Sequence, residues 1–425
     1  MGAHDVYLPP DEPSMAHRSY LSPDGKSVLL AEMDNDHLWL PCRVVPSDGS
    51  SSGQKVGPTG GGCTSGAWSQ DGKWIYLTSN AVGTNHIWRQ KFPDGQPEQV
   101  TSGPTEEEGI AMAPDGRSFV TAVAFQNAVL WVHDAKGERE ILVEGNAAWP
   151  KFTPDGTKLC YRVVKEPFGE STYYRDAGEV RAVDLASGRS EPVVPGFLAY
   201  DYDLSADGRQ MVLETMDGDG KPRLWIAPFD RSAPPRQIPN VEGSAPRFGP
   251  GGEIYFRHLE GKPNMIGNNG FAYRVQQDGT GLRKAIAQPI LLMWAVSPDG
   301  RWLEAWAPVG ASGPPAFQVF PLDGGSPSIV DSGTFFNWSN NGSSLSIESA
   351  FASLIREGRS YLIPLPRGQA VPRIPAKGFH SEEEVAHLPG ARKIESTYVV
   401  PGPSTDVYAF YRGNAQRNLY KIPVQ

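Results

Sequence analysis

A short turn motif recurs along the chain and limits the folds that are open to it. The motif reads Ser-Pro-Asp-Gly in its clearest copies, and its eight copies end at Gly25, Gly72, Gly116, Gly156, Gly208, Gly252, Gly300 and Gly342. The copies that end at Gly252 and Gly342 are degenerate. Successive glycines lie 47, 44, 40, 52, 44, 48 and 42 residues apart. Such a period is typical of β-propellers, in which each repeat forms one four-stranded blade.

The residues of the motif suit a hairpin turn. Proline presets φ, aspartate bonds to nearby backbone, and glycine adopts the positive φ that closes the turn. Strand-like segments follow the turns, for example residues 27–30, 74–77 and 253–256. A second segment with a central Trp comes next, as at 130–132 and 224–226, and a short third one ends the repeat, as at 99–101 and 236–238. With the strand before each turn, this pattern predicts four strands per repeat.

The two ends of the chain resemble the parts of one further unit. Residues 406–410 and 417–423 look like the two middle strands of a blade, and residues 5–9 offer a spare strand. Pairing of the N- and C-terminal strands would close the ring and remove its exposed edges. We therefore predict an all-β fold, a single closed β-propeller domain over residues 1–425. It has eight full repeats over about 15–376 and a split closing blade at 1–14 and 377–425, so the count is eight or nine blades.

Composition excludes several classes of protein. The net charge is −9 and no run of Lys or Arg stands out, so we expect no nucleic-acid partner. No apolar stretch of about 18 residues is present, so we expect no membrane span. The N-terminus does not read as a signal peptide, and we expect a soluble monomer. Cys42, Cys63 and Cys160 are widely spaced without a Cys-x-x-Cys pair, which favours three separate reduced thiols.

The turn-and-strand repeat resembles the TolB-like, WD40-like (PD40) propeller repeat of bacterial proteins over nearly the whole chain. Residues 15–24, 103–111, 378–382 and 416–423 are similar to the C-terminal propeller region of acidobacterial-type Ser/Thr protein kinases. That resemblance implies a bacterial, membrane-associated parent kinase whose propeller senses or binds a partner. The sequence contains no Gly-rich loop with a strand lysine, no His-Arg-Asp and no Asp-Phe-Gly, so kinase activity does not follow for this chain.

Propellers place chemistry at the mouth of the central channel, which is lined by the strand that precedes each turn motif. His17 precedes the first motif, and His380 and Glu382 precede the inner strand of the split unit. If the ring closes, these units are neighbours and the three side chains could bind one divalent metal (Ca, Zn or Mn). Such a metal would activate water or polarise a substrate oxygen. The alternative is that these side chains only solvate a water-filled channel.

Two further sets of residues fall at or near the channel. Glu107 and Glu108 could serve as a general acid and base, because neighbouring carboxylates raise one another's pKa. Asp201 and Asn337 could bind a ligand, and Trp149 and Trp294 could stack on it. The alternative for the carboxylates is solvation, and for the tryptophans it is packing between blades.

Two functions therefore remain open from the sequence. The first is a binding module of the sensor type, with a small molecule, a glycan or a protein as its ligand. The second is a metal-dependent hydrolase or lyase, of a lactonase, phosphotriesterase or uronate-lyase kind, with its active site in the channel. The first depends on the family resemblance, and the second depends on residue types at plausible channel positions.

Overall fold

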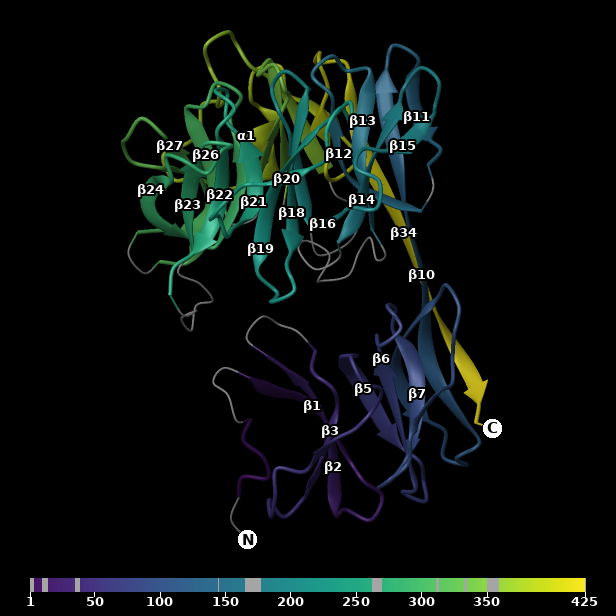
Figure 1. Cartoon of the computed structure of the whole chain (residues 1–425). Helices are drawn as coiled ribbons and strands as arrows, with labels where there is room; N and C mark the ends of the chain where they lie inside the picture. The colour runs from purple at the N-terminus through teal and green to yellow at the C-terminus, as the bar shows by residue number, and fades with distance from the viewer. Residues whose placement is uncertain are drawn as a thin grey trace. The chain divides into compact units, whose positions relative to one another are not determined.

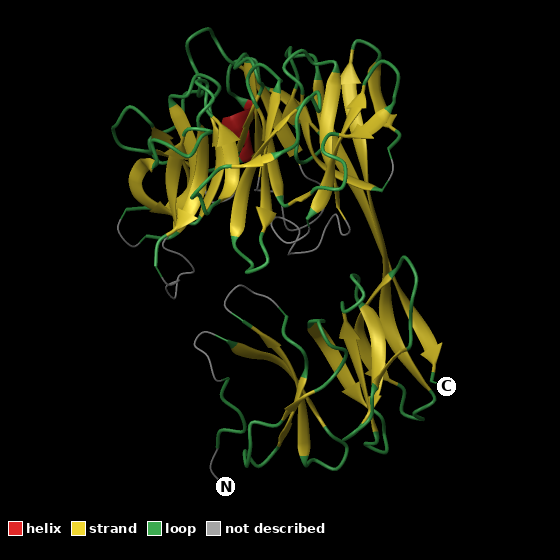
Figure 2. Ribbon diagram, in the orientation of Figure 1, coloured by secondary structure: helices red, strands yellow, loops and turns green. Residues whose placement is uncertain are grey.

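The chain is built almost entirely of β-strands. The computed structural model describes residues 4–9, 14–34, 39–143, 145–164, 177–261, 270–310, 313–331, 335–349 and 359–424. These residues form eight antiparallel sheets and one short helix, α1 (Glu382–Ala386), which Figure 2 shows in red. The helix begins where the Ser381 hydroxyl accepts the backbone N–H of Glu384, and its acidic first turn suits the positive end of the helix. The predicted all-β propeller class is confirmed, whereas the number of blades stays a prediction.

The residues divide into two compact units. Unit 1 comprises Met1–Asn127 and Asn414–Gln425, and unit 2 comprises Ala128–Gly413. The first sheet of unit 1 contains β1 (Met15–Leu21), β2 (Ser27–Met33), β3 (Arg43–Pro46) and β4 (Gln54–Lys55). The second contains β5 (Cys63–Trp68), β6 (Trp74–Ser79), β7 (His86–Lys91) and β8 (Pro97–Gln99). The organisation of residues 1–425 as a single domain stays a prediction.

Unit 2 contains five consecutive sheets, and Figure 1 labels strands of the first four, such as β13, β18, β22 and β26. The first sheet contains β12 (Asn146–Phe152), β13 (Lys158–Val164), β14 (Gly178–Asp184) and β15 (Ser190–Pro192), with β16 (Leu198–Ala199) beside β14, and the second contains β17 (Asp201–Leu204), β18 (Gln210–Met216), β19 (Pro222–Pro228) and β20 (Arg236–Gln237). The third sheet contains β21 (Ser244–Phe248), β22 (Ile254–Leu259), β23 (Gly270–Val275) and β24 (Arg283–Ile290), and the fourth contains β25 (Leu292–Val296), β26 (Trp302–Pro308), β27 (Pro315–Pro321) and β28 (Ser328–Asp331). The fifth sheet contains β29 (Phe336–Trp338), β30 (Ser344–Ser349), β31 (Arg359–Pro364) and β32 (Arg392–Ile394).

One sheet combines distant parts of the chain. Its order is β11 (Gly137–Ile141), β10 (Ser118–Asp134), β34 (Tyr408–Pro423) and β33 (Val400–Pro401), and β9 (Glu106–Met112) also pairs with β10. Both β10 and β34 contribute residues to each of the two units. Within unit 2, β33 packs against β12 of one sheet and against β29 and β30 of another.

Two predictions about the ends of the chain are wrong. Residues 406–410 and 417–423 do not form two strands, because β34 runs without a break from Tyr408 to Pro423. Residues 5–9 lie in no strand, and β34 pairs with β10 and β33 instead of an N-terminal strand. The physical reason is that β10, which is 17 residues long, offers β34 a strand edge with which to pair.

The repeated motif forms the predicted turns. In the first copy the Gly25 N–H donates to the Ser22 carbonyl over 2.9 Å, and Gly25 has a φ of 70°. The Ser22 hydroxyl donates to Asp24 Oδ1 over 2.6 Å, and the same carboxylate accepts the Lys26 N–H. Equivalent bonds occur at Thr153, Ser205 and Ser297. The motif is therefore a self-contained hairpin turn that joins the first two strands of a sheet.

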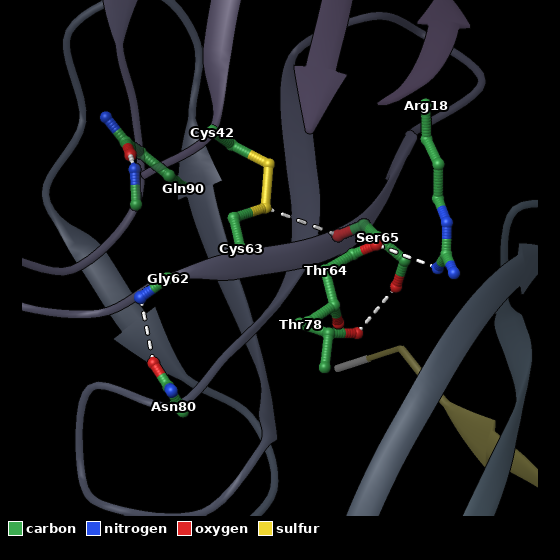
Figure 3. The surroundings of a disulfide bond; sticks show 10 residues. Arg18, Cys42, Gly62, Cys63, Thr64, Ser65, Thr78, Asn80 and Gln90 are labelled. Carbon is green, nitrogen blue, oxygen red and sulfur yellow. Dashed lines mark hydrogen bonds between the residues drawn. A yellow bond between two sulfur atoms is a disulfide. The ribbon is translucent and has the colours of Figure 1, made fainter. Parts of the chain in front are cut away.

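The prediction of three separate thiols is wrong for two of the cysteines. Cys42, just before β3, and Cys63, at the start of β5, form a disulfide between neighbouring sheets of unit 1 (Figure 3). Both residues are buried, and Ser65 and Thr78 join their hydroxyls nearby over 2.8 Å. Only 21 residues separate the two cysteines, yet the absence of a familiar spacing hid the pairing. Cys160 is a buried free thiol, as predicted, and burial raises its pKa to about 12.

Candidate ligand-binding pocket

One concave site lies in unit 2, where the first strands of its sheets converge. Residues from β12, β17, β21, β25, β29 and the β33–β34 hairpin line a pocket of about 180 Å³. All four residues that the sequence predicts as ligand-binding residues, Trp149, Asp201, Trp294 and Asn337, line this one pocket. The role of these four residues in binding stays a prediction.

A β-bulge places Trp149 at the pocket. The register of β12 with β13 shifts between Ala148 and Lys151, and Trp149 has a φ of 59°. A non-glycine residue in this left-handed region is sterically costly, so its surroundings must hold it in place. The Tyr202 hydroxyl on β17 does so by donating to the Trp149 carbonyl oxygen over 2.6 Å. The bulge re-aims the indole out of the regular alternation of the strand.

Aromatic side chains form one wall of the pocket. The ring of Trp149 lies 5.2 Å from that of Tyr398, 6.0 Å from that of Tyr411 and 6.4 Å from that of Trp294, measured between centroids. Tyr398 and Tyr411 stack on each other at 5.0 Å. Edge-to-face and offset contacts of this kind are favourable for aromatic pairs, so the rings hold one another in fixed positions.

Two ion pairs form the polar wall. Arg247 Nη1 donates to Asp201 Oδ2 over 2.7 Å, and Lys151 Nζ donates to Asp203 Oδ1 over 2.6 Å. Asp201 and Asp203 are two residues apart on β17, so their side chains leave the same face of the strand. Each carboxylate also accepts a backbone N–H through its other oxygen, from Tyr202 and Phe248 respectively. The four charged groups are therefore held rigidly between three sheets.

The electrostatics of Asp201 follow from this arrangement. Burial alone would raise the pKa of its carboxyl, but the positive charges of Arg247 and Lys151 outweigh that effect and lower the pKa. Asp201 is consequently a carboxylate at neutral pH. Arg247 is fixed further because its Nε donates to the Trp294 carbonyl oxygen over 2.6 Å. The guanidinium thus links the polar wall to the aromatic wall.

Buried glutamates join successive sheets behind the pocket. Glu214 on β18 accepts the N–H of Ala245 over 2.8 Å, and Glu348 on β30 accepts the N–H of Tyr398 over 3.1 Å. Ala245 and Tyr398 both have left-handed backbones, with a φ of 53° each. Burial raises the pKa of both carboxyls to about 7, and the nearby charge of Asp201 adds to the effect on Glu214. These carboxyls hold two strained residues in place, one of which lines the pocket.

The predicted acid–base pair lies in unit 1 and its two members have different surroundings. Glu107 is buried, and its Oε2 lies 2.8 Å from His86 Nδ1 and accepts the Thr101 hydroxyl over 2.6 Å. Glu108 is partly exposed and pairs with Arg417 at 2.5 Å. Glu107 therefore sits in a hydrogen-bonded cluster that links β7 to β9. A catalytic role for either carboxylate stays a prediction.

The predicted metal ligands are distributed over both units. His17 is exposed on β1 of unit 1, where its ring makes an edge contact with Trp39. His380 and Glu382 belong to unit 2, and Glu382 pairs with Arg359 at 3.1 Å and accepts the Tyr361 hydroxyl over 2.6 Å. Among the residues described, no group of three or more His, Cys, Asp or Glu side chains could hold a metal ion. The metal and its three ligands stay a prediction.

Sequence reasoning missed several residues of the pocket. They are Lys151, Asp203, Arg247, Tyr398 and Tyr411. The alternation Asp201-Tyr202-Asp203 just before a turn motif was a usable signal, because it places two carboxylates on one face of an inner strand. Nothing local marked Arg247 as the partner of Asp201, since 46 residues separate the two.

Comparisons with known proteins give similarities of fold. No protein-family model matches the chain, and no curated protein matches it. Similar solved structures include a candidate TolB from Agrobacterium tumefaciens, 16% identical, with a TM-score of 0.47, covering 68% of this chain and 99% of that one. TolB from Acinetobacter baumannii is 13% identical, with a TM-score of 0.41, covering 70% and 76%. An oligogalacturonate lyase from Vibrio parahaemolyticus is 11% identical, with a TM-score of 0.36, covering 82% and 81%.

These identities and scores are too low to transfer a ligand, a partner or an activity to this chain. The resemblance to the propeller region of a kinase stays a prediction. In the part of the chain that the structure describes, no helix is long and apolar enough to cross a membrane.

Proposed function

We propose that the protein is a binding module that holds a small molecule in the pocket of unit 2. The observation that carries this proposal is the convergence of six sheets on one cavity that combines an aromatic wall with two fixed ion pairs. Ligand sites are typically concave, largely apolar and supplied with a few precisely placed polar groups. The pocket has each of these properties, and its polar groups are held by further hydrogen bonds.

Preorganisation supports binding. Arg247 and Asp201 are fixed by contacts to three sheets, and Trp149 is fixed by Tyr202. A ligand that enters the pocket therefore need not order these side chains, which lowers the entropic cost of binding. The metal-dependent hydrolase or lyase and the sensor role in a kinase-like receptor stay predictions, because they rest on residues and resemblances outside this pocket.

Thermal unfolding of the full chain against a small-molecule panel tests the proposal. A ligand at about 100 times its Kd should stabilise the folded state by about 2.7 kcal/mol, which is readily visible as a rise in Tm. The Asn337→Ala and Trp294→Phe variants should lose this rise. Trp131→Phe is the matched control, because Trp131 stacks on Phe410 at 6.4 Å and does not line the pocket. Equal shifts in Trp294→Phe and Trp131→Phe would place the ligand elsewhere and reject the proposal.

A further inference from the structure

We infer that the ligand of this pocket is a neutral, hydroxyl-rich molecule with vicinal diols, that is, a saccharide. The inference rests on the proposed function and adds the chemical class of the ligand. It is supported by the two ion pairs on the polar wall and by the aromatic wall of the same cavity.

Each cation of the two ion pairs is compensated by a carboxylate of the protein. Arg247 is compensated by Asp201 and Lys151 by Asp203, at 2.7 and 2.6 Å. A third cation, Arg162, also lines the pocket, and its charge contributes to the lowered pKa of Asp201. An anionic ligand would lie against Asp201 and Asp203, and a cationic ligand would lie against Arg247 and Lys151, so either would compete with an existing pair. A neutral ligand avoids this cost.

The polar wall presents carboxylate acceptors on Asp201 and Asp203 beside the ammonium donors of Lys151. A carboxylate offers about four lone-pair sites, and each aspartate uses one position on each oxygen for a protein donor. Lys151 has three N–H donors, of which Asp203 accepts one. One hydroxyl of a diol can therefore donate to the carboxylate while its neighbour accepts from the cation. A hydroxyl is the group that can take either role.

The spacing of the pairs suits a ligand with more than one diol. Asp201 and Asp203 lie two residues apart on β17. At a rise of about 3.3 Å per residue, their Cα atoms therefore lie roughly 7 Å apart. Trp149 and Tyr398 offer apolar surface to the C–H faces of a sugar ring, as aromatic side chains do in ligand sites. Asn337 adds an amide that can both donate and accept.

Binding of a defined set of oligosaccharides to the full chain tests the inference. The set contains neutral oligosaccharides, their fully O-methylated forms and uronate-containing ones, first on an array and then by calorimetry. We expect neutral oligosaccharides to bind and O-methylation to abolish binding. Asp203→Asn should weaken binding at least tenfold and Asn337→Ala severalfold. Lys284→Met is the matched control, because it removes a comparable ion pair with Glu260 outside the pocket and should bind normally.

The outcomes separate this inference from the proposed function. Preferential binding of uronates, or equal binding of O-methylated forms, would overturn the inference. A ligand without diols that binds with the same sensitivity to Asn337→Ala would overturn it too, while supporting the binding function. If no compound of any class shifts the Tm of the wild-type chain, the proposed function itself fails. If the Asp203→Asn variant fails to fold, the Asn337→Ala variant still tests the inference, because Asn337 is not part of an ion pair.

Discussion

Glu214 should make the stability of the protein fall as the pH rises from acid to neutral. Its side chain is 2% exposed and its carboxyl accepts the Ala245 N–H over 2.8 Å. Burial, together with the charge of Asp201, raises the pKa from 4.5 to about 7 despite the opposing effects of that hydrogen bond, Arg247 and Arg162. The folded state therefore favours the protonated carboxyl, whereas the unfolded chain has the ordinary pKa.

The sign and size of the effect follow from proton linkage. Below pH 4.5 both states carry the proton, and the full stability is present. Between pH 4.5 and about 7 the unfolded chain loses the proton while the folded chain keeps it, so the free energy of unfolding falls as pH rises. A pKa difference of one between the folded and unfolded states corresponds to about 1.4 kcal/mol. The free energy of unfolding therefore falls by about 3 kcal/mol in total, and the fall is complete above about pH 7. Glu348 should add a similar loss, because its pKa is also raised to about 7.

Replacing Glu214 with Gln keeps an oxygen that accepts the Ala245 N–H and removes the ionisation. Urea unfolding of the full chain, measured at intervals between pH 4 and 8, should show a loss with pH that is about 3 kcal/mol smaller in Glu214→Gln than in the wild type. Glu140→Gln, at an exposed residue of β11, is the control and should follow the wild-type curve. Parallel curves for Glu214→Gln and the wild type would refute the reasoning.

Three further predictions concern the core. Cys160 is buried, so the native chain should react with no iodoacetamide, as measured by intact mass. The urea-unfolded chain should take up one label at Cys160, and the unfolded and reduced chain should take up one label at each of its 3 cysteines. Two or more labels without reductant would contradict the disulfide. Gly66→Ala should cost about 1–3 kcal/mol by urea unfolding, because the new methyl would lie 2.4 Å from Leu29 Cδ2, whereas Gly218→Ala meets nothing within 4 Å and should be nearly neutral. Tyr202→Phe removes the donor to the Trp149 carbonyl oxygen and should lower stability by about 1–2 kcal/mol; an unchanged urea midpoint would show that this bond contributes nothing.

The repeat and its turns could be predicted from the sequence because they depend on local chemistry. The turn at Gly25 is closed by bonds among Ser22, Asp24 and Lys26, all within a few residues. The same locality explains why Asp201 and Asn337 could be placed on the first strand of a sheet, since that strand directly precedes the turn motif. Alternation along that strand then tells which side chains share a face.

The partners of these residues were decided by the tertiary structure. Asp201 meets Arg247 from another sheet, Glu348 meets Tyr398 across 50 residues of sequence, and Cys42 meets Cys63 across two sheets. The pairing of β34 with β10 joins Tyr408–Pro423 to Ser118–Asp134, which lie far apart in the sequence. No local pattern encodes such contacts, because they arise when sheets pack and bury apolar surface together.

The sequence by itself determined the all-β class, the repeat length, the turn chemistry and the strands on which a site could lie. The tertiary structure decided which charges compensate one another, which carboxyls are buried enough to have a pKa of about 7, and which strand completes the sheet of β10. The physical reason is range: φ preferences and turn bonds act within a few residues, whereas desolvation and ion pairing depend on groups that only packing brings together.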